Sequence, residues 1–384
     1  MPTNGSVESF RDFLIPRVKK IVLIDGVVPG SEEVMPKIEE YDEHKADPKL
    51  HESSWWMFLL KPWLKLTNSH GTRISFKLRD FLSIFDWCMR DKTHFDYFVG
   101  LESIYGLAGI ILRKTGRVDK VIYYVSDYSP NRFSRGWFNQ LYLALDRFCA
   151  MHADFIWDVS KVFHPTRIKF GLDPQKSAPV IHVPNGLYPG QTMITPIRQI
   201  EPYSLAFMGT LGEENGPDLA IETLPLILKK YPRTKLHIVG GGNNNLNRLK
   251  LLAKSLGVIK HIRFWGFVVD SREMSRIVSK CFVGLAPYRS FPGSIRYYGD
   301  ATKIRTYAAA GLPVVTTDVP PLGRELYEFG GALLVSDTKE DFAKAVISVF
   351  SNKMLYTQLR RQAIKFAKNS TWDNTFTQAF YRSQ

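Results

Sequence analysis

The chain has 384 residues, of which 45% are hydrophobic and 23% are charged, and its formal net charge at pH 7 is +14. This length suits two domains, and the composition is that of a globular protein. The basic charge predicts an acidic partner. No zinc-finger spacing or RNA-recognition signature is present, so we do not expect nucleic acid to be this partner. Three separated cysteines without a CxxC pair indicate a reducing compartment. The N-terminus lacks a secretory signal and no apolar run reaches roughly 20 residues, so we expect a cytoplasmic protein.

The first half of the chain predicts an α/β domain with an irregular beginning. Residues 19–25 (KKIVLID) are a β-branched run that suits its first strand. Residues 29–48 carry many charges with little periodicity, so we expect an exposed loop or a broken helix there. From Asp96 onward a strand–helix–strand rhythm predicts a βαβ unit. The expected segments are 97–101, 104–113 and 120–125, followed by a helix at 135–151 and strands at 154–160 and 178–183.

The segment between Trp55 and Met89 mixes aromatic and basic side chains at helical spacing. Such a mixture is typical of an interfacial helix that lies on anionic lipid. Packing in the core, with the lysines solvated outside, is the alternative. On the first interpretation, the residues that contact the membrane or an acceptor are Trp55, Trp56, Trp63, Arg73 and Lys77.

The second half predicts a doubly wound parallel sheet, because strands and helices alternate without interruption from Ser204. A proline-containing polar stretch at 189–202 indicates the linker that precedes it. The expected strands are 205–208, 235–239, 261–265, 282–286 and 313–317. The expected helices are 218–230, 247–256, 271–279, 302–310, 339–350 and a last amphipathic stretch at 355–367.

Two loops of this second half are candidates for a phosphate site, because ligands of open parallel sheets bind beyond the carboxyl ends of the strands. Gly209 and Thr210 lie in a glycine loop through which the backbone can approach a phosphate closely. Thr302 and Lys303 open a helix, and a lysine in a first helical turn opposes the helix dipole unless an anion offsets it. An ordinary turn and a solvated lysine are the alternatives.

A third loop, with Gly266, Phe267 and Val268, follows the strand that ends at Trp265. Its backbone groups could hydrogen-bond the edge of a nucleobase while an aromatic ring packs nearby. A simple strand-to-helix turn is equally compatible with these residues.

In their order and spacing, these motifs resemble the family 4-type GT-B glycosyltransferases. The resemblance is carried by Asn185-Gly186, Met208-Gly209, Val239 to Gly242, Phe264 to Gly266, Lys303 and the YxxxGxPVV motif of Tyr307 to Val315. It implies an α/β GT-B fold in which two Rossmann-like doubly wound domains face each other across a cleft. The implied parts are an acceptor-binding domain (1–190), a linker (191–203), a nucleotide-sugar-binding domain (204–365) and a C-terminal helix that crosses back to the first domain (366–384).

The chain departs from this family at several positions. Many retaining members carry glutamates where Tyr298 and Thr306 stand, and a basic pair where Thr210 and Asn215 stand. The remaining pattern is similar to the membrane-associated glucuronosyltransferase of xanthan assembly and its relatives, which are inverting, so the stereochemistry stays open. The donor-binding residues that we expect are Gly209, Thr210, Gly266, Phe267, Val268, Tyr288, Thr302, Lys303 and Thr306, with Arg296 or Asp300 nearby.

No DxD triplet occurs in the sequence, so we expect protein cations to take the place of a metal ion, with no cofactor besides the nucleotide-sugar donor. Asp127 follows a predicted strand, and its carboxylate is our candidate for the general base that deprotonates an acceptor hydroxyl. Glu102 ends the preceding strand and is the second candidate. A turn or N-cap role is the alternative for Asp127. Arg132 and Arg135 could meet an acceptor diphosphate.

The predicted function is therefore that of a hexosyltransferase (EC 2.4) of polysaccharide biosynthesis. It would move a sugar from a UDP- or GDP-sugar to a lipid-linked or membrane-proximal glycan, in peripheral contact with anionic lipid on the inner face of the cell membrane. Two alternatives remain open. One is a GT-B sugar-nucleotide epimerase, which needs no acceptor, and the other is a non-catalytic scaffold, which the missing glutamates suggest.

Overall fold

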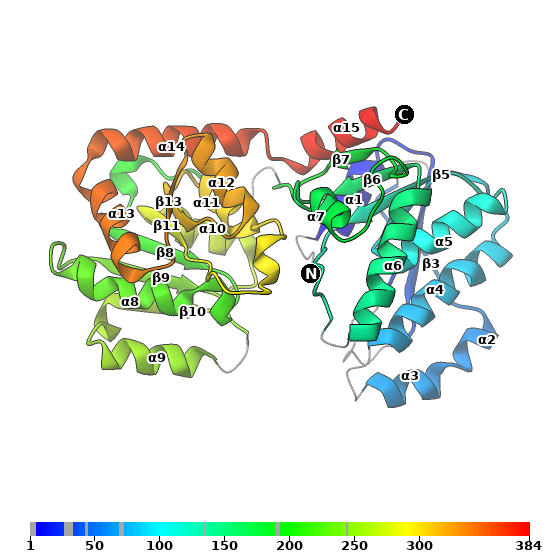
Figure 1. Ribbon diagram of the computed structural model, residues 1–384, viewed down its shortest axis with the longest axis horizontal. Coiled ribbons are helices and arrows are strands. Elements are labelled where there is room, and N and C mark those ends of the chain that lie inside the picture. Colours follow the sequence, from blue (N-terminus) through cyan, green and yellow to red (C-terminus); the bar gives the residue numbers. More distant parts are fainter. Residues whose placement is uncertain are drawn as a thin grey trace. The chain divides into compact units, whose positions relative to one another are not determined.

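The computed structural model describes residues 5–26, 34–42, 45–68, 73–133, 136–188, 193–242 and 245–384. Arg135, one of the predicted acceptor residues, lies outside this set. The chain divides into two compact units, Met1–Val183 together with Phe376–Gln384, and Pro184–Thr375. Each unit is described by itself below, and both are drawn in Figure 1.

The first unit is built on a parallel sheet with the strand order β4-β5-β6-β7, so the predicted βαβ unit is confirmed. Its strands are β4 (Phe95–Leu101), β5 (Val118–Val125), β6 (Phe155–Asp158) and β7 (Val180–His182). Its connecting helices are α5 (Ser103–Lys114), α6 (Gly136–His152) and α7 (Phe163–Lys169). The helix α5 can lie close to the sheet because Gly109 faces it, where an added Cβ would come within 3.0 Å of Val121 Cγ1.

An internal ion-pair network joins three elements of this unit. Arg167 on α7 is completely buried and pairs with Asp146 on α6 at 2.9 Å and with Asp158 at the end of β6 at 2.7 Å. Burial raises the pKa of Asp158 to about 6, although the Arg167 guanidinium opposes the shift. Removal of either aspartate or of Arg167 would leave a buried charge unpaired. The network therefore holds the carboxyl end of β6 in place.

A second sheet of the first unit corrects the expectation for the N-terminal region. The strands β1 (Lys20–Asp25), β2 (Lys37–Asp42) and β3 (Lys49–His51) form an antiparallel sheet of their own. The first strand therefore does not belong to the parallel sheet, and residues 37–42 are a strand where a loop or broken helix was expected. Residues 27–33 lie outside the described part.

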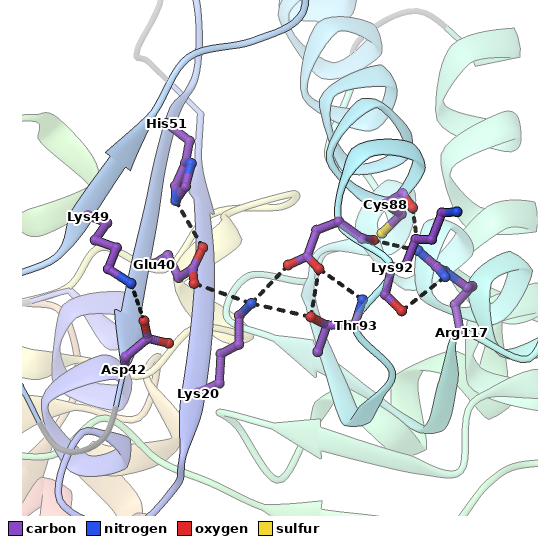
Figure 2. A network of polar contacts seen from close by, with 10 residues as sticks. Lys20, Glu40, Asp42, Lys49, His51, Cys88, Lys92, Thr93 and Arg117 are labelled. Carbon is purple, nitrogen blue, oxygen red and sulfur yellow. Dashed lines mark hydrogen bonds and ion pairs between the residues drawn. The ribbon is translucent and has the colours of Figure 1, made fainter.

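The charges on β2 are accommodated by specific partners. Figure 2 shows Glu40 between Lys20 and His51, with Lys20 Nζ 3.2 Å from Glu40 Oε1 and His51 Nε2 2.9 Å from Glu40 Oε2. The same Lys20 ammonium lies 2.9 Å from Asp91 Oδ2 and donates to Thr93 Oγ1 at 3.3 Å. Lys20 thus joins the antiparallel sheet to the segment that precedes β4.

The aromatic and basic segment is helical, as its spacing predicts. It forms α2 (Trp55–Phe58), α3 (Lys61–Asn68) and the long helix α4 (Arg73–Arg90). The N-terminus of α2 is tied to α4, because the Ser54 amide donates to Asp86 Oδ2 at 3.0 Å. Among the described residues, no helix is long and apolar enough to cross a membrane.

The second unit confirms the predicted doubly wound parallel sheet. Its strand order is β10-β9-β8-β11-β12-β13, and every pairing in it is parallel. The strands are β8 (Ser204–Met208), β9 (Lys235–Val239), β10 (Ile262–Gly266), β11 (Val283–Ala286), β12 (Val314–Thr317) and β13 (Ala332–Val335). The order reverses between β8 and β11, and ligands of such sheets bind at this switch point.

Helices cover both faces of this sheet, because side chains of each buried strand alternate between two cores. Leu205 and Phe207 pack into one core, whereas Ala206 and Met208 pack into the other. The first core is closed by α8 (Pro217–Leu228), α9 (Asn245–Ser255) and α13 (Lys339–Ser351). The second is closed by α10 (Ser271–Ser279), α11 (Thr302–Ala309), α12 (Pro321–Glu328) and the last turns of α14 (Lys353–Lys368).

Two connecting segments of the chain meet on this second unit, close to the points where the units divide. The Leu187 amide donates to the Ser370 carbonyl at 2.9 Å, and an added Cβ at Gly186 would overlap the backbone of Trp372. Arg305 on α11 donates to Ser370 Oγ at 3.0 Å and pairs with Asp300, whose Oδ2 accepts the Asn185 amide at 2.9 Å. After Ser370 the chain forms α15 (Trp372–Arg382), which ends in the first unit, where Trp157 Nε1 donates to Ser383 Oγ at 2.9 Å.

The Lys20–Asp91 pair gives the first unit a predicted acid sensitivity. Partial burial disfavours the Asp91 carboxylate, but hydrogen bonds from Thr93 and the Lys20 ammonium outweigh it and lower the pKa of Asp91 from 3.8 to about 2. A depressed carboxyl pKa contributes stability above the unfolded pKa, and this contribution is lost as the pH falls from about 4 to about 2. Asp91→Asn should therefore cost about 1–2 kcal/mol at neutral pH and progressively less in acid.

Urea unfolding of the wild type and the variant at about pH 7 and about pH 3 measures this difference. Asp173→Asn is the matched control, because Asp173 is 43% exposed and its ion partner Lys176 lies 3.6 Å away. A stability loss that is the same at both pH values would contradict the assignment to the Asp91 charge.

Candidate functional site

The glycine loops of the second unit lie next to one another at the carboxyl edge of the sheet. The Gly209 amide donates to the Val239 carbonyl at 3.0 Å, and the Gly240 amide donates to the Gly266 carbonyl at 2.8 Å. At Gly240 φ is +148°, and an added Cβ would collide with the Gly209 carbonyl oxygen. Glycine is required there because the β8 and β9 loops touch through their backbones. The first and third predicted loops are thereby brought to one edge.

Lys303 projects from the first turn of α11 to the first of these loops. Its side chain is only 6% exposed, and an added Cβ at Gly209 would lie 3.4 Å from Lys303 Cε. Gly209 has φ of +130°, so a side chain there would be both strained and blocked by Lys303. The structure therefore places the two phosphate candidates of the sequence against each other, at the β8–β11 switch point.

The environment of the Lys303 ammonium is apolar except for two charged groups. Nζ lies 4.5 Å from the ring centre of Phe207 and 4.4 Å from that of Tyr288, both within cation–π range. It has no hydrogen-bond partner among the described residues. Burial, reinforced by the nearby Arg296 guanidinium, lowers the pKa of Lys303 well below its ordinary value, and Glu214 opposes this shift. A buried ammonium without an acceptor is unfavourable, so an anion that met Lys303 Nζ would stabilise it.

A salt bridge lies beside this lysine. Arg296 Nη2 is 2.6 Å from Glu214 Oε1, and each side chain is about one third exposed, at 33% and 35%. Glu214 belongs to the short 3-10 helix that follows β8, and Arg296 to the one between β11 and α11. Sequence reasoning named Arg296 as a nearby residue but missed Glu214. No local pattern of the sequence pairs Glu214 with Arg296, because 82 residues separate them.

The other predicted donor residues surround this centre in different ways. Thr210 is exposed, and its Oγ1 accepts from Asn215 Nδ2 at 2.6 Å, so the two residues that replace the family's basic pair bind each other. Thr306 is buried and donates to the Thr302 carbonyl at 3.1 Å, which occupies its hydroxyl within the helix. Tyr288 is buried beneath Lys303.

The third loop remains a candidate for base recognition. Phe267 is 77% exposed, and its Cβ would lie 3.1 Å from a Cβ added at Gly241. Val268 is half-buried, and Gly266 adopts φ of +71°. An exposed aromatic ring beside the β9 glycines offers a surface on which a planar group can pack.

In the first unit, the two candidate bases follow neighbouring parallel strands. Glu102 comes directly after β4, and Asp127 follows β5, so both lie at the carboxyl edge of this sheet. Arg132 links them, because its Nη1 donates to the Asp127 carbonyl at 2.7 Å and its Nη2 lies 3.2 Å from Glu102 Oε1. The structure thus gathers three predicted residues that are up to 30 positions apart.

The two carboxylates differ in their surroundings. Glu102 also pairs with Lys77 at 2.7 Å, so its two carboxylate oxygens already contact two cations, Lys77 and Arg132. Its φ of +71° is unusual for a residue with a side chain and stores strain of about 1–3 kcal/mol. Asp127 is exposed, and no described residue donates to or pairs with its carboxylate. Of the two, Asp127 is the better placed to accept a proton.

The aromatic segment presents part of its surface to solvent. Trp55 is 76% exposed, Leu59 is 69% exposed and Trp63 is 42% exposed, at intervals of four residues. Trp56 is half-buried, and Lys65 is exposed. Lys77 does not lie with this group, because it pairs with Glu102. The backbone of Arg73 starts α4, and its side chain is not described.

Comparisons with known proteins agree with the fold. Residues 202–352 match the family described as glycosyl transferases group 1. The chain is 29% identical over 177 residues to the mannosylfructose-phosphate synthase of Agrobacterium fabrum, covering 43% of this chain and 37% of that protein. It is 27% identical over 249 residues to the O-antigen biosynthesis glycosyltransferase WbnH of Escherichia coli, covering 65% of each. The structure of Anabaena HepE in complex with UDP superposes with a TM-score of 0.64 at 15% identity, over 84% of this chain and 89% of that one.

The two Rossmann-like parallel sheets and these superpositions define a GT-B fold. Within this fold, residues 202–352 belong to the group 1 glycosyl transferases. The predicted fold and family are confirmed, whereas the finer likeness to the xanthan glucuronosyltransferase stays a prediction. The aligned region spans 37% and 65% of the two curated relatives, so what the whole chain does is a separate question.

The unpaired ammonium leads to a stability prediction. Lys303→Met keeps the aliphatic stem between Phe207 and Tyr288 and removes the buried charge. In the absence of ligand, we expect the variant to be more stable than the wild type by about 1–3 kcal/mol, because the desolvation penalty disappears. Chemical unfolding without ligand measures this gain, with Lys344→Met on the exposed face of α13 as the control. A destabilised Lys303→Met protein would contradict an unpaired ammonium.

Proposed function

We propose that this protein transfers a hexosyl group from a nucleoside-diphosphate sugar to a hydroxyl group of a lipid-linked or membrane-proximal glycan. The observation that carries the proposal is the buried Lys303 ammonium at the switch point of the second unit, which has no hydrogen-bond partner in the part of the chain that the structure describes. A diphosphate beside it would supply the missing acceptors. The ammonium would then stabilise the negative charge that develops on the leaving diphosphate.

The proposed nucleotide-sugar donor follows from the kind of chemical group that fits beside Gly209. A phosphate can approach the backbone at Gly209 because no side chain stands there, and α11 directs its N-terminus to the same place. Metal-free stabilisation of the leaving group is part of the proposal. UDP is the first candidate, since the superposed HepE structure contains it, and GDP is the second.

The acceptor side rests on Asp127 in the first unit. Its exposed carboxylate would remove the proton from the acceptor hydroxyl as that oxygen attacks the anomeric carbon. Arg132, held between Glu102 and the Asp127 carbonyl, would position an anionic group of the acceptor. A glycan acceptor is supported by WbnH, which is an O-antigen biosynthesis glycosyltransferase.

Peripheral membrane contact is the third part of the proposal. Trp55, Leu59 and Trp63 expose apolar surface at regular spacing. Lys61, with its Nζ 4.3 Å from the Phe58 ring centre, and the exposed Lys65 supply positive charge in the same segment. Aromatic side chains favour the headgroup region, and lysines attract anionic lipid. This combination would bring the enzyme to a membrane-embedded acceptor.

Ligand binding and turnover test the two halves of the site separately. UDP or GDP should raise the melting temperature of the wild type, since a ligand of the folded state stabilises it. Lys303→Ala should abolish this shift. Asp127→Asn should keep the shift but lower the release of nucleoside diphosphate from UDP- or GDP-sugars, in the presence of a lipid-linked glycan extract, by about 10²–10⁴-fold.

Asp119→Asn is the matched control, because Asp119 lies near the other end of β5 and is 61% exposed. An intact nucleotide shift in Lys303→Ala would place the donor elsewhere. An epimerised sugar nucleotide, formed from donor alone without acceptor, would replace the transferase by the epimerase alternative. Binding without any turnover would favour the scaffold.

Vesicle binding tests the membrane contact. The double variant Trp55→Ser/Trp63→Ser should bind vesicles of phosphatidylglycerol and phosphatidylcholine about tenfold more weakly than the wild type, because two interfacial anchors are lost. Co-sedimentation measures this binding. Trp137→Ser on α6 removes a tryptophan that is 67% exposed and serves as the control. An equal loss in the control would show that the segment from Trp55 to Trp63 is not the contact.

A further inference from the structure

The salt bridge between Arg296 and Glu214 is placed where a donor diphosphate would bind. Both side chains act electrostatically on Lys303, Arg296 against its positive charge and Glu214 in favour of it. Glu214 precedes Asn215, whose Nδ2 donates to Oγ1 of Thr210, and Thr210 follows Gly209, which lies against Lys303. The three charged groups therefore meet at one loop, and their formal charges sum to one positive charge. This is too little to balance a nucleoside diphosphate while Glu214 still carries its charge into the same site.

Arg296 keeps donor capacity that the salt bridge does not use. One terminal nitrogen, Nη2, meets Glu214 at 2.6 Å, whereas the enclosed Nε has no hydrogen-bond partner among the described residues. A guanidinium is planar and donates from Nε and Nη2 in parallel, which suits two oxygens of a phosphate better than the single carboxylate oxygen seen here. An unfilled donor of this kind is costly unless a ligand meets it.

The chain also lacks the basic residues that its family usually places near this loop. Thr210 and Asn215 stand there, and they hydrogen-bond each other at 2.6 Å. Lys303 would otherwise face the diphosphate with only the backbone to help it. Arg296 is the nearby cation that acts on Lys303, and it comes from the loop on the other side of the switch point.

We propose that Arg296 is a second diphosphate-binding residue, and that Glu214 is its counter-ion only while the donor is absent. Donor phosphate takes the place of Glu214 on Arg296, so Glu214 competes with the donor for the same guanidinium. The pairing keeps Arg296 ordered, and it makes donor binding weaker than the two cations alone would. This inference rests on the proposed function, because it assumes that the anion at Lys303 is a nucleoside diphosphate.

Because Glu214 and the donor compete for Arg296, substitutions of the two residues should change the donor affinity in opposite directions. Arg296→Met should weaken the binding of UDP, or of GDP if GDP is the nucleotide that binds, by about tenfold or more, and Arg296→Lys should weaken it less because the charge remains. Glu214→Gln should strengthen binding severalfold. In the double variant Arg296→Met/Glu214→Gln, the gain from Glu214→Gln should disappear, because the residue for which Glu214 competes is gone.

Isothermal titration of the 384-residue chain with UDP and GDP measures the wild type and the four variants. Arg324→Met is the matched control, since Arg324 pairs with Asp318 on the surface of the same unit, and it should leave binding unchanged. Unfolding curves without ligand verify that each variant is folded. Weaker binding in Glu214→Gln, whether or not Arg296 is present, would overturn the proposal and make Glu214 a donor ligand or a support of Lys303.

The outcomes separate this inference from the proposed function. Wild-type binding that Lys303→Ala abolishes but Arg296→Met leaves intact would overturn the role of Arg296 alone. Failure of the wild type to bind either nucleotide would overturn the proposed function, and this inference with it.

Discussion

One unfavourable interaction distinguishes the second unit: the Lys303 ammonium is buried and has no hydrogen-bond partner among the described residues. Two aromatic rings, Phe207 and Tyr288, offset part of the lost hydration, but an aromatic face does not replace a charged acceptor. A fold keeps such a group only where the surrounding packing holds it in place. Here the packing is that of α11, whose Ile304, Tyr307 and Ala308 are fully buried against the sheet. The packing of the core thus holds the unfavourably buried Lys303 ammonium in place at the edge of the sheet.

The strand order of the second sheet determines where the Lys303 ammonium lies. Because the strand order reverses between β8 and β11, the loops that follow these two strands leave the sheet in different directions. Gly209 lies in the loop that follows β8, and Arg296 lies in the segment that follows β11. The first unit repeats the principle with a smaller sheet, where Glu102 and Asp127 follow adjacent strands and Arg132 links them. Polar and charged side chains lie at the carboxyl edges of the two parallel sheets because helices cover the faces of these sheets.

Much of this was accessible from the sequence, and the limits have physical causes. The alternation of short apolar strands with amphipathic helices predicted the doubly wound sheet, and the lysine that opposes a helix dipole indicated the anion site. The strand β2 (KIEEYD) was missed because Glu40 is paired by residues of other strands, Lys20 of β1 and His51 of β3, which a local pattern does not reveal. Glu39 contacts Lys37 and Tyr41 within β2 itself. The salt bridge of Glu214 with Arg296 was missed for the same reason, since 82 residues separate its partners. Local patterns carry no information on such pairs.

The contact of Gly186 with Trp372 has a consequence for how the chain joins its two units. Asn185 and Ser370, on the outgoing and the returning connection, are both bound through Arg305 and its partner Asp300, and Arg305 is two positions from Lys303 on the same helix. The buried pair of Arg305 with Asp300 therefore ties both connections to α11. Loss of the Arg305–Asp300 pair would therefore release the outgoing and the returning connection from α11 together.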